Sequence, residues 1–180
     1  MRRLHLTRII LVGILVLIGI AGRLLPHVWN ATPVTAIALF ASYYIGWRYS
    51  SAAVFGIMLA SDFFLGFYAW PIMLAVYAGF AAAVCIGHYI RHYAAKSPIA
   101  ILAGSLGSSL LFFIITNWAV WQFGTMYAHT FAGLADCYMM ALPFFRNTLA
   151  GDIAYTSVFF GAYELVLAAR TSPAKMMQPF

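Results

Sequence analysis

Six apolar stretches separated by short polar breaks are the feature that most constrains how this chain folds. They cover about residues 9 to 25, 33 to 47, 51 to 68, 71 to 90, 98 to 121 and 146 to 169. A helix needs about 20 mostly apolar residues to cross a bilayer, and the second stretch is too short to cross fully as a straight, perpendicular helix. Only 8% of the residues are charged, whereas soluble domains carry about 25%. The sequence therefore predicts an all-α integral membrane protein with a six-span helical bundle.

The basic residues between the stretches predict the orientation. Lys and Arg collect in cytoplasmic loops, while Asp and Glu count for little. With the N-terminus inside, most basic residues fall on the cytoplasmic side: Arg2, Arg3, Arg8, Arg48, Arg91, Lys96, Arg170 and Lys175. Arg23 and Arg146 fall on the other side. Both termini are therefore expected in the cytoplasm. The formal charge of +6 is explained by this asymmetry, because basic loops contact the anionic headgroups of the lipid bilayer. It therefore does not indicate nucleic-acid binding.

The chain shows no polar linker, low-complexity tract or repeat, so we predict a single transmembrane domain over residues 1–180. The segment 122 to 145 is apolar but is interrupted by Gly133 and Pro143. Irregular backbone at membrane depth is tolerated only where protein or a watery cavity surrounds it. We therefore expect this segment to fold back onto the bundle. A short lid helix from about Thr130 to Leu142 would then precede the last span.

One stretch carries a small residue at every fourth position, namely Ala75, Gly79, Ala83 and Gly87. Such a ridge lets the backbone of another helix approach closely. We expect the approaching helix to belong to this chain, and contact with a partner protein is the alternative.

Ionisable residues within a span are expensive and are by default candidates for a functional site. Asp62 and Asp152 lie within apolar stretches, and Arg146 begins the last one. At 100° per residue, Arg146 and Asp152 lie about 240° apart around a helix and cannot share a face. We therefore predict that Arg146 meets Asp62 from another helix, and that Asp152 faces a different neighbour such as Arg23.

Two interpretations of these charges stay open. They either form buried pairs that fix helix packing, or they line a polar pocket that opens outward. The second is favoured because aromatic and polar residues map to the same outer half of the chain: Trp29, Asn30, Trp70, Asn117, Trp118, Trp121, Tyr127 and His129. Convergent polar groups among aromatic rings are typical of small-molecule sites, although Trp and Tyr also form interfacial belts.

Motifs of catalysis and metal binding are weak in this sequence. His88 and His92 have a spacing that can bind a metal from one helical face, but neither has a carboxylate close by in the sequence. The segment GSLGSS, residues 104 to 109, lacks the Gly-x-Ser-x-Gly order of a nucleophile elbow. We therefore expect neither an enzyme nor a bound metal or cofactor.

Several segments resemble a known family. They are NATPVTAIALFASYYIG, SDFFLGFY, LFFIITNWAVW and LPFFRNTLAGDIAY, together with the basic N-terminus. From about Arg23 to Ala168 the chain is similar to small bacterial membrane proteins related to the substrate-binding S components of energy-coupling-factor vitamin transporters. Among these it is nearest to the solitary cobalamin-uptake members. The resemblance implies a six-span bundle in the inner membrane, with a ligand site that opens outward beneath covering loops.

The resemblance also implies roles for three residues. Asp62 and Arg146 correspond to polar positions of the cobalamin-type members, and Tyr77 to a further pocket residue. Residues 63 to 84 lack the cysteine with which those members bind cobalt, so a corrinoid is one candidate cargo among vitamin-like molecules. The first span has no Ala-xxx-Ala pair for docking to an energy-coupling module, so a solitary protein and one that docks by another surface both stay open.

These observations together predict a substrate-binding membrane protein for uptake of a vitamin or vitamin-like small molecule. Its substrate-binding residues are expected to be Asp62, Arg146, Asn147, Asn117, Trp118, Trp70, Tyr77 and Asp152. The alternative is a structural or accessory membrane subunit whose buried charges only lock helices together.

Overall fold

The computed structural model describes residues 2–26, 30–94 and 97–171, and no strand occurs within these ranges. Six helices follow one another: α1 (Arg2–Leu24), α2 (Val34–Tyr44), α3 (Trp47–Leu65), α4 (Trp70–Tyr93), α5 (Pro98–Phe123) and α6 (Phe131–Thr171). The prediction of an all-helical chain with six helices is confirmed. In the described part of the chain, four helices are long and apolar enough to cross a membrane, over His5–Leu24, Trp70–Tyr93, Pro98–Phe123 and Phe131–Ala169. Trp29, Lys96 and Lys175 lie outside the described residues.

Glycine and proline set several helix boundaries. Gly46 between α2 and α3 has a φ of 130°, and Gly66 at the end of α3 has a φ of 93°. Glycine adopts such positive φ values without the steric penalty that a Cβ imposes. At the start of α5 the Ser97 side chain accepts a hydrogen bond from the backbone N–H of Ala100 at 3.3 Å, and Pro98 occupies the first turn, where its missing N–H has no cost.

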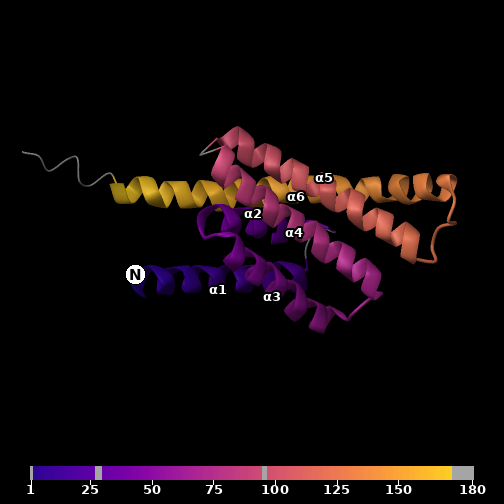
Figure 1. Cartoon of the computed structure of the whole chain (residues 1–180), viewed down its shortest axis with the longest axis horizontal. Coiled ribbons are helices and arrows are strands. Elements are labelled where there is room, and N and C mark those ends of the chain that lie inside the picture. The colour runs from indigo at the N-terminus through magenta and orange to yellow at the C-terminus, as the bar shows by residue number, and fades with distance from the viewer. Residues whose placement is uncertain (1, 27–29, 95–96, 172–180) are drawn as a thin grey trace, which may run out of the picture.

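The short helix α2 lies at the centre of the molecule and contacts all five other helices (Figure 1). Every residue from 34 to 43 is buried. Two serine hydroxyls fasten it to its neighbours: Ser42 Oγ donates to the carbonyl oxygen of Val84 on α4 at 2.7 Å, and Ser50 Oγ of α3 donates to that of Ala38 at 2.8 Å. The eleven residues of α2 agree with the prediction that the second stretch is too short to cross a bilayer, and the surrounding helices cover it.

The small-residue ridge of α4 contacts other helices of this chain. A Cβ on Gly87 would lie 2.7 Å from the carbonyl oxygen of Leu39 on α2, and one on Gly79 would lie 2.7 Å from the Phe112 ring on α5. Ala83 between them is buried. The ridge therefore brings α4 close to α2 and α5, as expected for packing within the chain.

Helix α6 corrects the prediction of a separate lid helix. Residues 131 to 171 form one helix of 41 residues, about 60 Å long at 1.5 Å per residue, with Pro143 inside it. A proline interrupts the helical hydrogen bonds, but tertiary contacts hold α6 to α5 on both sides of it. Before it, Tyr138 donates to the carbonyl oxygen of Ile114 at 2.7 Å. After it, the Phe145 ring stacks on Phe113 with 4.4 Å between the centroids.

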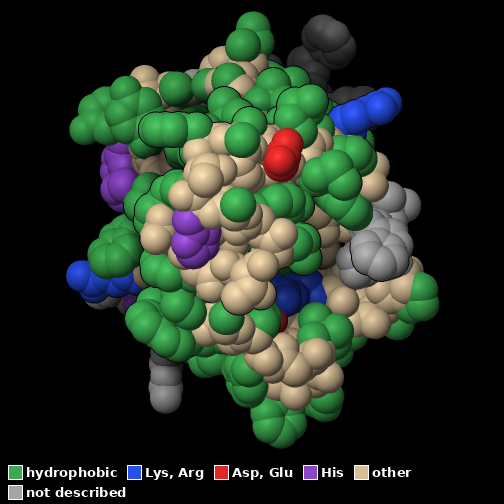
Figure 2. Space-filling model, turned by 90° about the vertical axis from the view of Figure 1, so that its right-hand side faces the viewer, with side chains coloured by type: hydrophobic (Ala, Val, Ile, Leu, Met, Phe, Trp, Pro, Cys, Tyr) green, Lys and Arg blue, Asp and Glu red, His purple; other side chains and the backbone are tan. Residues whose placement is uncertain are grey.

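The molecule has two distinct ends along its long axis (Figure 1). The first residues of α1 and the last residues of α6 lie together at one end, which we call the terminal end. The turn from α3 to α4 and the turn from α5 to α6 lie at the opposite end, which we call the distal end. Figure 2 looks onto the distal end and shows mostly hydrophobic and uncharged side chains there.

Candidate functional site

A cavity of about 400 Å³ lies toward the distal end, and we call it the distal cavity. All helices and the segment before α2 contribute to its lining: Arg23, Asn30, Thr32, Thr35, Leu65, Val76, Phe80, Phe112, Thr116, Thr148 and Asp152. A side chamber of about 140 Å³ shares four of these residues and extends to Asn117 and Phe145 between α5 and α6. Apolar walls with a few polar groups are the usual composition of a small-molecule site.

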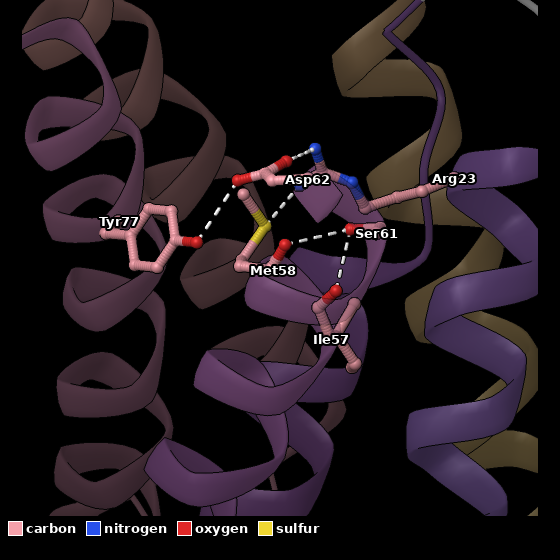
Figure 3. A network of polar contacts seen from close by, with 6 residues as sticks. All are labelled: Arg23, Ile57, Met58, Ser61, Asp62 and Tyr77. Atoms are coloured by element: carbon pink, nitrogen blue, oxygen red, sulfur yellow. Dashed lines mark hydrogen bonds and ion pairs between the residues drawn. The ribbon is translucent and has the colours of Figure 1, made fainter. Parts of the chain in front are cut away.

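Arg23 reaches this cavity from the last turn of α1 and is held by Asp62 of α3 (Figure 3). Its Nη2 lies 2.5 Å from Asp62 Oδ1, and its Nη1 contacts the Met58 sulfur. The other carboxylate oxygen, Oδ2, accepts a hydrogen bond from the Tyr77 hydroxyl at 3.1 Å. The Asp62 side chain is 1% exposed and that of Arg23 is 15% exposed. Asp62 is thus saturated by its neighbours and positions the guanidinium, which remains partly accessible.

This ion pair corrects the predicted partners. Asp62 meets Arg23 and not Arg146, and Asp152 has no ion pair with Arg23 within the described part of the chain. The sequence placed Arg23 at the correct depth, but the pairing depends on how α1 lies against α3, and the charge pattern carries no information on that. Arg146 is exposed and lines neither the distal cavity nor its side chamber.

Asp152 lies deep in the distal cavity, on α6, and is 2% exposed. Its Oδ2 accepts a hydrogen bond from Ser109 of α5 at 2.6 Å, and Thr35 of α2 also bonds to this carboxyl group. Gly151 beside it lets the segment before α2 approach α6, because a Cβ there would lie 2.9 Å from the Cβ of Ala31. A buried carboxyl group is therefore contacted by hydroxyls from two helices and stands at the wall of a cavity.

Asn30 lines both the distal cavity and the side chamber. Its φ of 63° lies in the left-handed region, which asparagine tolerates better than most residues because its short polar side chain bonds locally. Asn30 is exposed. Asn30 was singled out among the outer polar residues, and the structure places it at the site.

The other predicted site residues divide into two groups. Asn117 lines the side chamber, where its Nδ2 donates to the carbonyl oxygen of Phe113 at 2.8 Å, and Tyr77 contacts the site through Asp62. Three residues line neither cavity: Asn147, which is half-buried, and Trp70 and Trp118, whose side chains are 69% and 47% exposed. The structure thus brings Asp62, Asp152 and Asn117 to one region and leaves Asn147 and the two tryptophans outside it.

A family model covers nearly the whole chain, over residues 4–175, and its description is a family of unknown function (DUF6580). The chain belongs to this family. No curated protein and no solved structure matches it.

Several hydroxyl residues at the site of this DUF6580 chain were not predicted from the sequence. Thr35, Thr116 and Thr148 line the distal cavity, and Ser109 contacts Asp152 from behind it. Serine and threonine are common in membrane helices, where they bond to their own backbone, so their presence alone predicts no site. No other sequence feature marks them, because their place at the site depends on how α5 and α6 face each other.

Proposed function

We propose that this chain is a membrane protein of the bacterial inner membrane that binds a vitamin-like small molecule in the distal cavity for uptake, in the manner of solitary S components. The observation that carries this proposal is the distal cavity itself. It is hollow, it joins a side chamber, and it presents a guanidinium and a carboxyl group among apolar walls. A chain whose charges only fix helix packing needs no such space.

The surface of the helices supports placement in a membrane. Large apolar side chains are exposed along them, including Leu17 at 69%, Phe63 at 73% and Leu165 at 72%. Soluble monomers rarely expose contiguous apolar patches of this kind, whereas lipid covers them. Arg8, Arg48 and Arg91 lie in the helix segments nearest the terminal end, so the tendency of basic residues to stay inside favours a cytoplasmic terminal end. The distal cavity would then face outward.

The side chains that line the distal cavity indicate which kinds of ligand it would bind. Arg23 suits a carboxylate or another anionic group of the ligand, because a guanidinium forms directed hydrogen bonds with such groups. Asp152, Thr35 and Asn30 offer partners for a hydrogen-bond donor, and Phe80 and Phe112 suit an apolar or flat part. A volume of about 400 Å³ fits a compact molecule. A corrinoid with its macrocycle and nucleotide tail is larger and would require the cavity to widen.

A structural or accessory subunit is the second candidate, and one observation favours it. Arg23, Asp62 and Tyr77 form a network from three helices in which both carboxylate oxygens are used within the protein (Figure 3). Such a network fixes the register of α1, α3 and α4 with or without a ligand.

Mass spectrometry of small molecules retained by the detergent-purified protein tests the proposal. We expect a vitamin-sized species in the wild type and its loss in Asn30→Gly, which removes the amide from both chambers while keeping the left-handed backbone. Arg146→Ala is the matched control and should retain the species, because Arg146 lines neither chamber. Equal retention by wild type and Asn30→Gly, or a folded wild type that stays empty when grown and purified in rich medium, would favour the accessory subunit.

A further inference from the structure

A second cavity of about 450 Å³ lies toward the terminal end, between α2, α5 and α6, and we call it the terminal cavity. Most of its lining is aromatic or aliphatic, and Glu164 is the charged residue that lines it in the described part of the chain. It shares no lining residue with the distal cavity. The terminal cavity is therefore a separate space, and the function proposed for the distal cavity does not use it.

Buried hydroxyl groups separate the two cavities. Among the lining residues of α6, Thr156 lies farthest from Glu164, and its hydroxyl bonds to that of Ser105 at 3.1 Å. One turn further along α6, Asp152 of the distal cavity accepts a hydrogen bond from Ser109. Thr156, Ser105 and Ser109 are fully buried and are satisfied within the protein. The inner end of the terminal cavity thus presents no unpaired polar group to a ligand.

The polarity of the terminal cavity changes along its length. Thr156, Phe160 and Glu164 follow one another at four-residue intervals on α6, so they lie on one face of the helix. Eight residues of helix correspond to about 12 Å. Glu164 is exposed, whereas Phe160 and Thr156 are buried. The cavity therefore has a carboxylate at its mouth, near the terminal end, and apolar walls deeper in the bundle.

The carboxylate at the mouth is available to a cation. Tyr44 donates a hydrogen bond to Glu164 Oε1 at 2.5 Å, and no basic side chain that the structure describes forms an ion pair with Glu164. The rings of Tyr43, Tyr44 and Phe160 pack together as one wall of the cavity, with centroids 4.7 to 5.6 Å apart. Aromatic rings attract ammonium groups through their faces. An ammonium group at the mouth would therefore meet both Glu164 Oε2 and aromatic rings.

The terminal cavity is also open between α5 and α6. Leu102, Ser157 and Gly161 line it there and are exposed. Close to them on α6, Val158 and Leu165 are 62% and 72% exposed. In the membrane placement proposed above, on which this inference rests, lipid covers these apolar side chains. An acyl chain could then enter the cavity from the side, while a headgroup stays at the mouth.

We propose that the terminal cavity binds a phospholipid of the cytoplasmic leaflet that carries a primary ammonium headgroup. The ammonium donates to Glu164, and one acyl chain runs along Ile101 and Phe160 toward Thr156. A primary ammonium has three N–H donors. The trimethylammonium of a choline headgroup has none, and a glycerol headgroup has no positive charge to pair with the carboxylate. The site therefore selects its lipid by the headgroup.

Native mass spectrometry of the full chain in detergent tests this selection. The protein is titrated with phosphatidylethanolamine, phosphatidylcholine and phosphatidylglycerol that have identical acyl chains. We expect the first bound lipid to be phosphatidylethanolamine, with a dissociation constant about tenfold lower than for the other two, because it alone forms a charge-assisted hydrogen bond with Glu164. Equal dissociation constants for the three lipids in the wild type would overturn the proposal.

Gly161→Leu tests whether this preference arises in the terminal cavity. A Cβ at Gly161 meets nothing within 4 Å, so the leucine side chain occupies the cavity, and leucine favours a helix more than glycine does. We expect the preference for phosphatidylethanolamine to be lost. Gly56→Leu is the matched control and should keep it, since a Cβ there also meets nothing within 4 Å and Gly56 lines neither cavity. An unchanged preference in Gly161→Leu would place the lipid elsewhere and reject the site.

Glu164→Gln tests the role of the charge. Its amide oxygen can still accept from Tyr44, so we expect the variant to fold and to bind the three lipids without preference. Dodecylamine, which has an ammonium group and one chain but no phosphate, is the competing probe. If it binds the wild type and not Glu164→Gln while phosphatidylethanolamine shows no preference, the occupant is a free amphiphilic amine and the lipid assignment is wrong.

The same spectra keep this inference distinct from the proposed uptake function. Gly161 and Glu164 do not line the distal cavity, so both variants should retain any vitamin-sized species bound there. Retention of that species without a headgroup preference in the wild type would reject the lipid site alone. A headgroup preference in a wild type that carries no vitamin-sized species would support the lipid site and count against the uptake function.

Discussion

At the scale of single residues, the ion pair of Arg23 and Asp62 both joins two helices and positions a charged group at the distal cavity. The carboxylate is buried and spends both oxygens on Arg23 and Tyr77, while the guanidinium keeps a face toward the distal cavity. A buried ion pair often stabilises a protein no more than apolar residues of the same shape would, but breaking it leaves one charge uncompensated. Its components should therefore respond very differently to single and combined substitution.

Asp62→Asn is expected to lower the free energy of unfolding by about 3 kcal/mol, because it leaves the Arg23 charge without its partner. The triple variant Arg23→Met, Asp62→Leu, Tyr77→Phe removes the whole network and should recover most of that loss. Denaturant unfolding of the three proteins in detergent measures this. Equal stability of Asp62→Asn and wild type would show that the carboxylate is not needed to hold the guanidinium.

At the scale of helices, two contacts decide the architecture. The close approach of α4 to α2 depends on glycine, since a Cβ on Gly87 would meet the backbone of Leu39. The continuity of α6 depends on its contacts with α5, which hold the helix on both sides of Pro143. Each contact brings lining residues to a cavity.

Gly87→Ala is expected to destabilise the protein by about 1–3 kcal/mol, because the added methyl group overpacks the contact with α2. Gly107→Ala is the matched control, since a Cβ at Gly107 meets nothing within 4 Å. There alanine should be neutral or stabilising by up to about 1 kcal/mol through its better helix propensity. Thermal unfolding in detergent compares the two variants, and similar shifts in both would argue against the close approach.

A continuous α6 fixes the distance between its two halves. Ala135 and Leu165 are exposed and lie thirty residues apart on α6. One uninterrupted helix places their backbones about 45 Å apart. Spin labels at these positions, in a background without native cysteines, report the distance by double electron–electron resonance. A markedly shorter or bimodal distance distribution would support the separate lid helix that the sequence predicts.

At the scale of the whole molecule, the basic residues and the two cavities are arranged along the long axis. Both described chain ends lie at the terminal end (Figure 1). One cavity lies toward each end, and the buried hydroxyls and Asp152 lie between them. The orientation proposed from the basic residues makes the distal cavity the outward-facing one.

Labelling of single cysteines checks this orientation. Thr125 and His92 are exposed near opposite ends of the bundle. We expect Thr125→Cys to react with a membrane-impermeant maleimide in intact cells, whereas His92→Cys should react only after permeabilisation, because basic loops stay in the cytoplasm. The reverse pattern would place the distal cavity inside.

Much of the fold follows from the sequence by itself. Apolar runs, glycines and prolines predicted six helices and the short second one, because each of these depends on local composition. They also singled out Asp62, Asp152, Asn117 and Asn30 as polar residues of the outer half. The position of a residue along its helix can be predicted from the sequence of that segment alone.

Only the tertiary structure decided which residues meet. It paired Asp62 with Arg23 instead of Arg146, it joined the lid segment to α6, and it left Trp70 and Trp118 at the surface. The facing side of a helix depends on contacts with several neighbours at once, and in an apolar chain the hydrophobic periodicity that marks a buried face is weak. The cavities and the hydroxyls between them arise from those contacts, so no single segment could have revealed them.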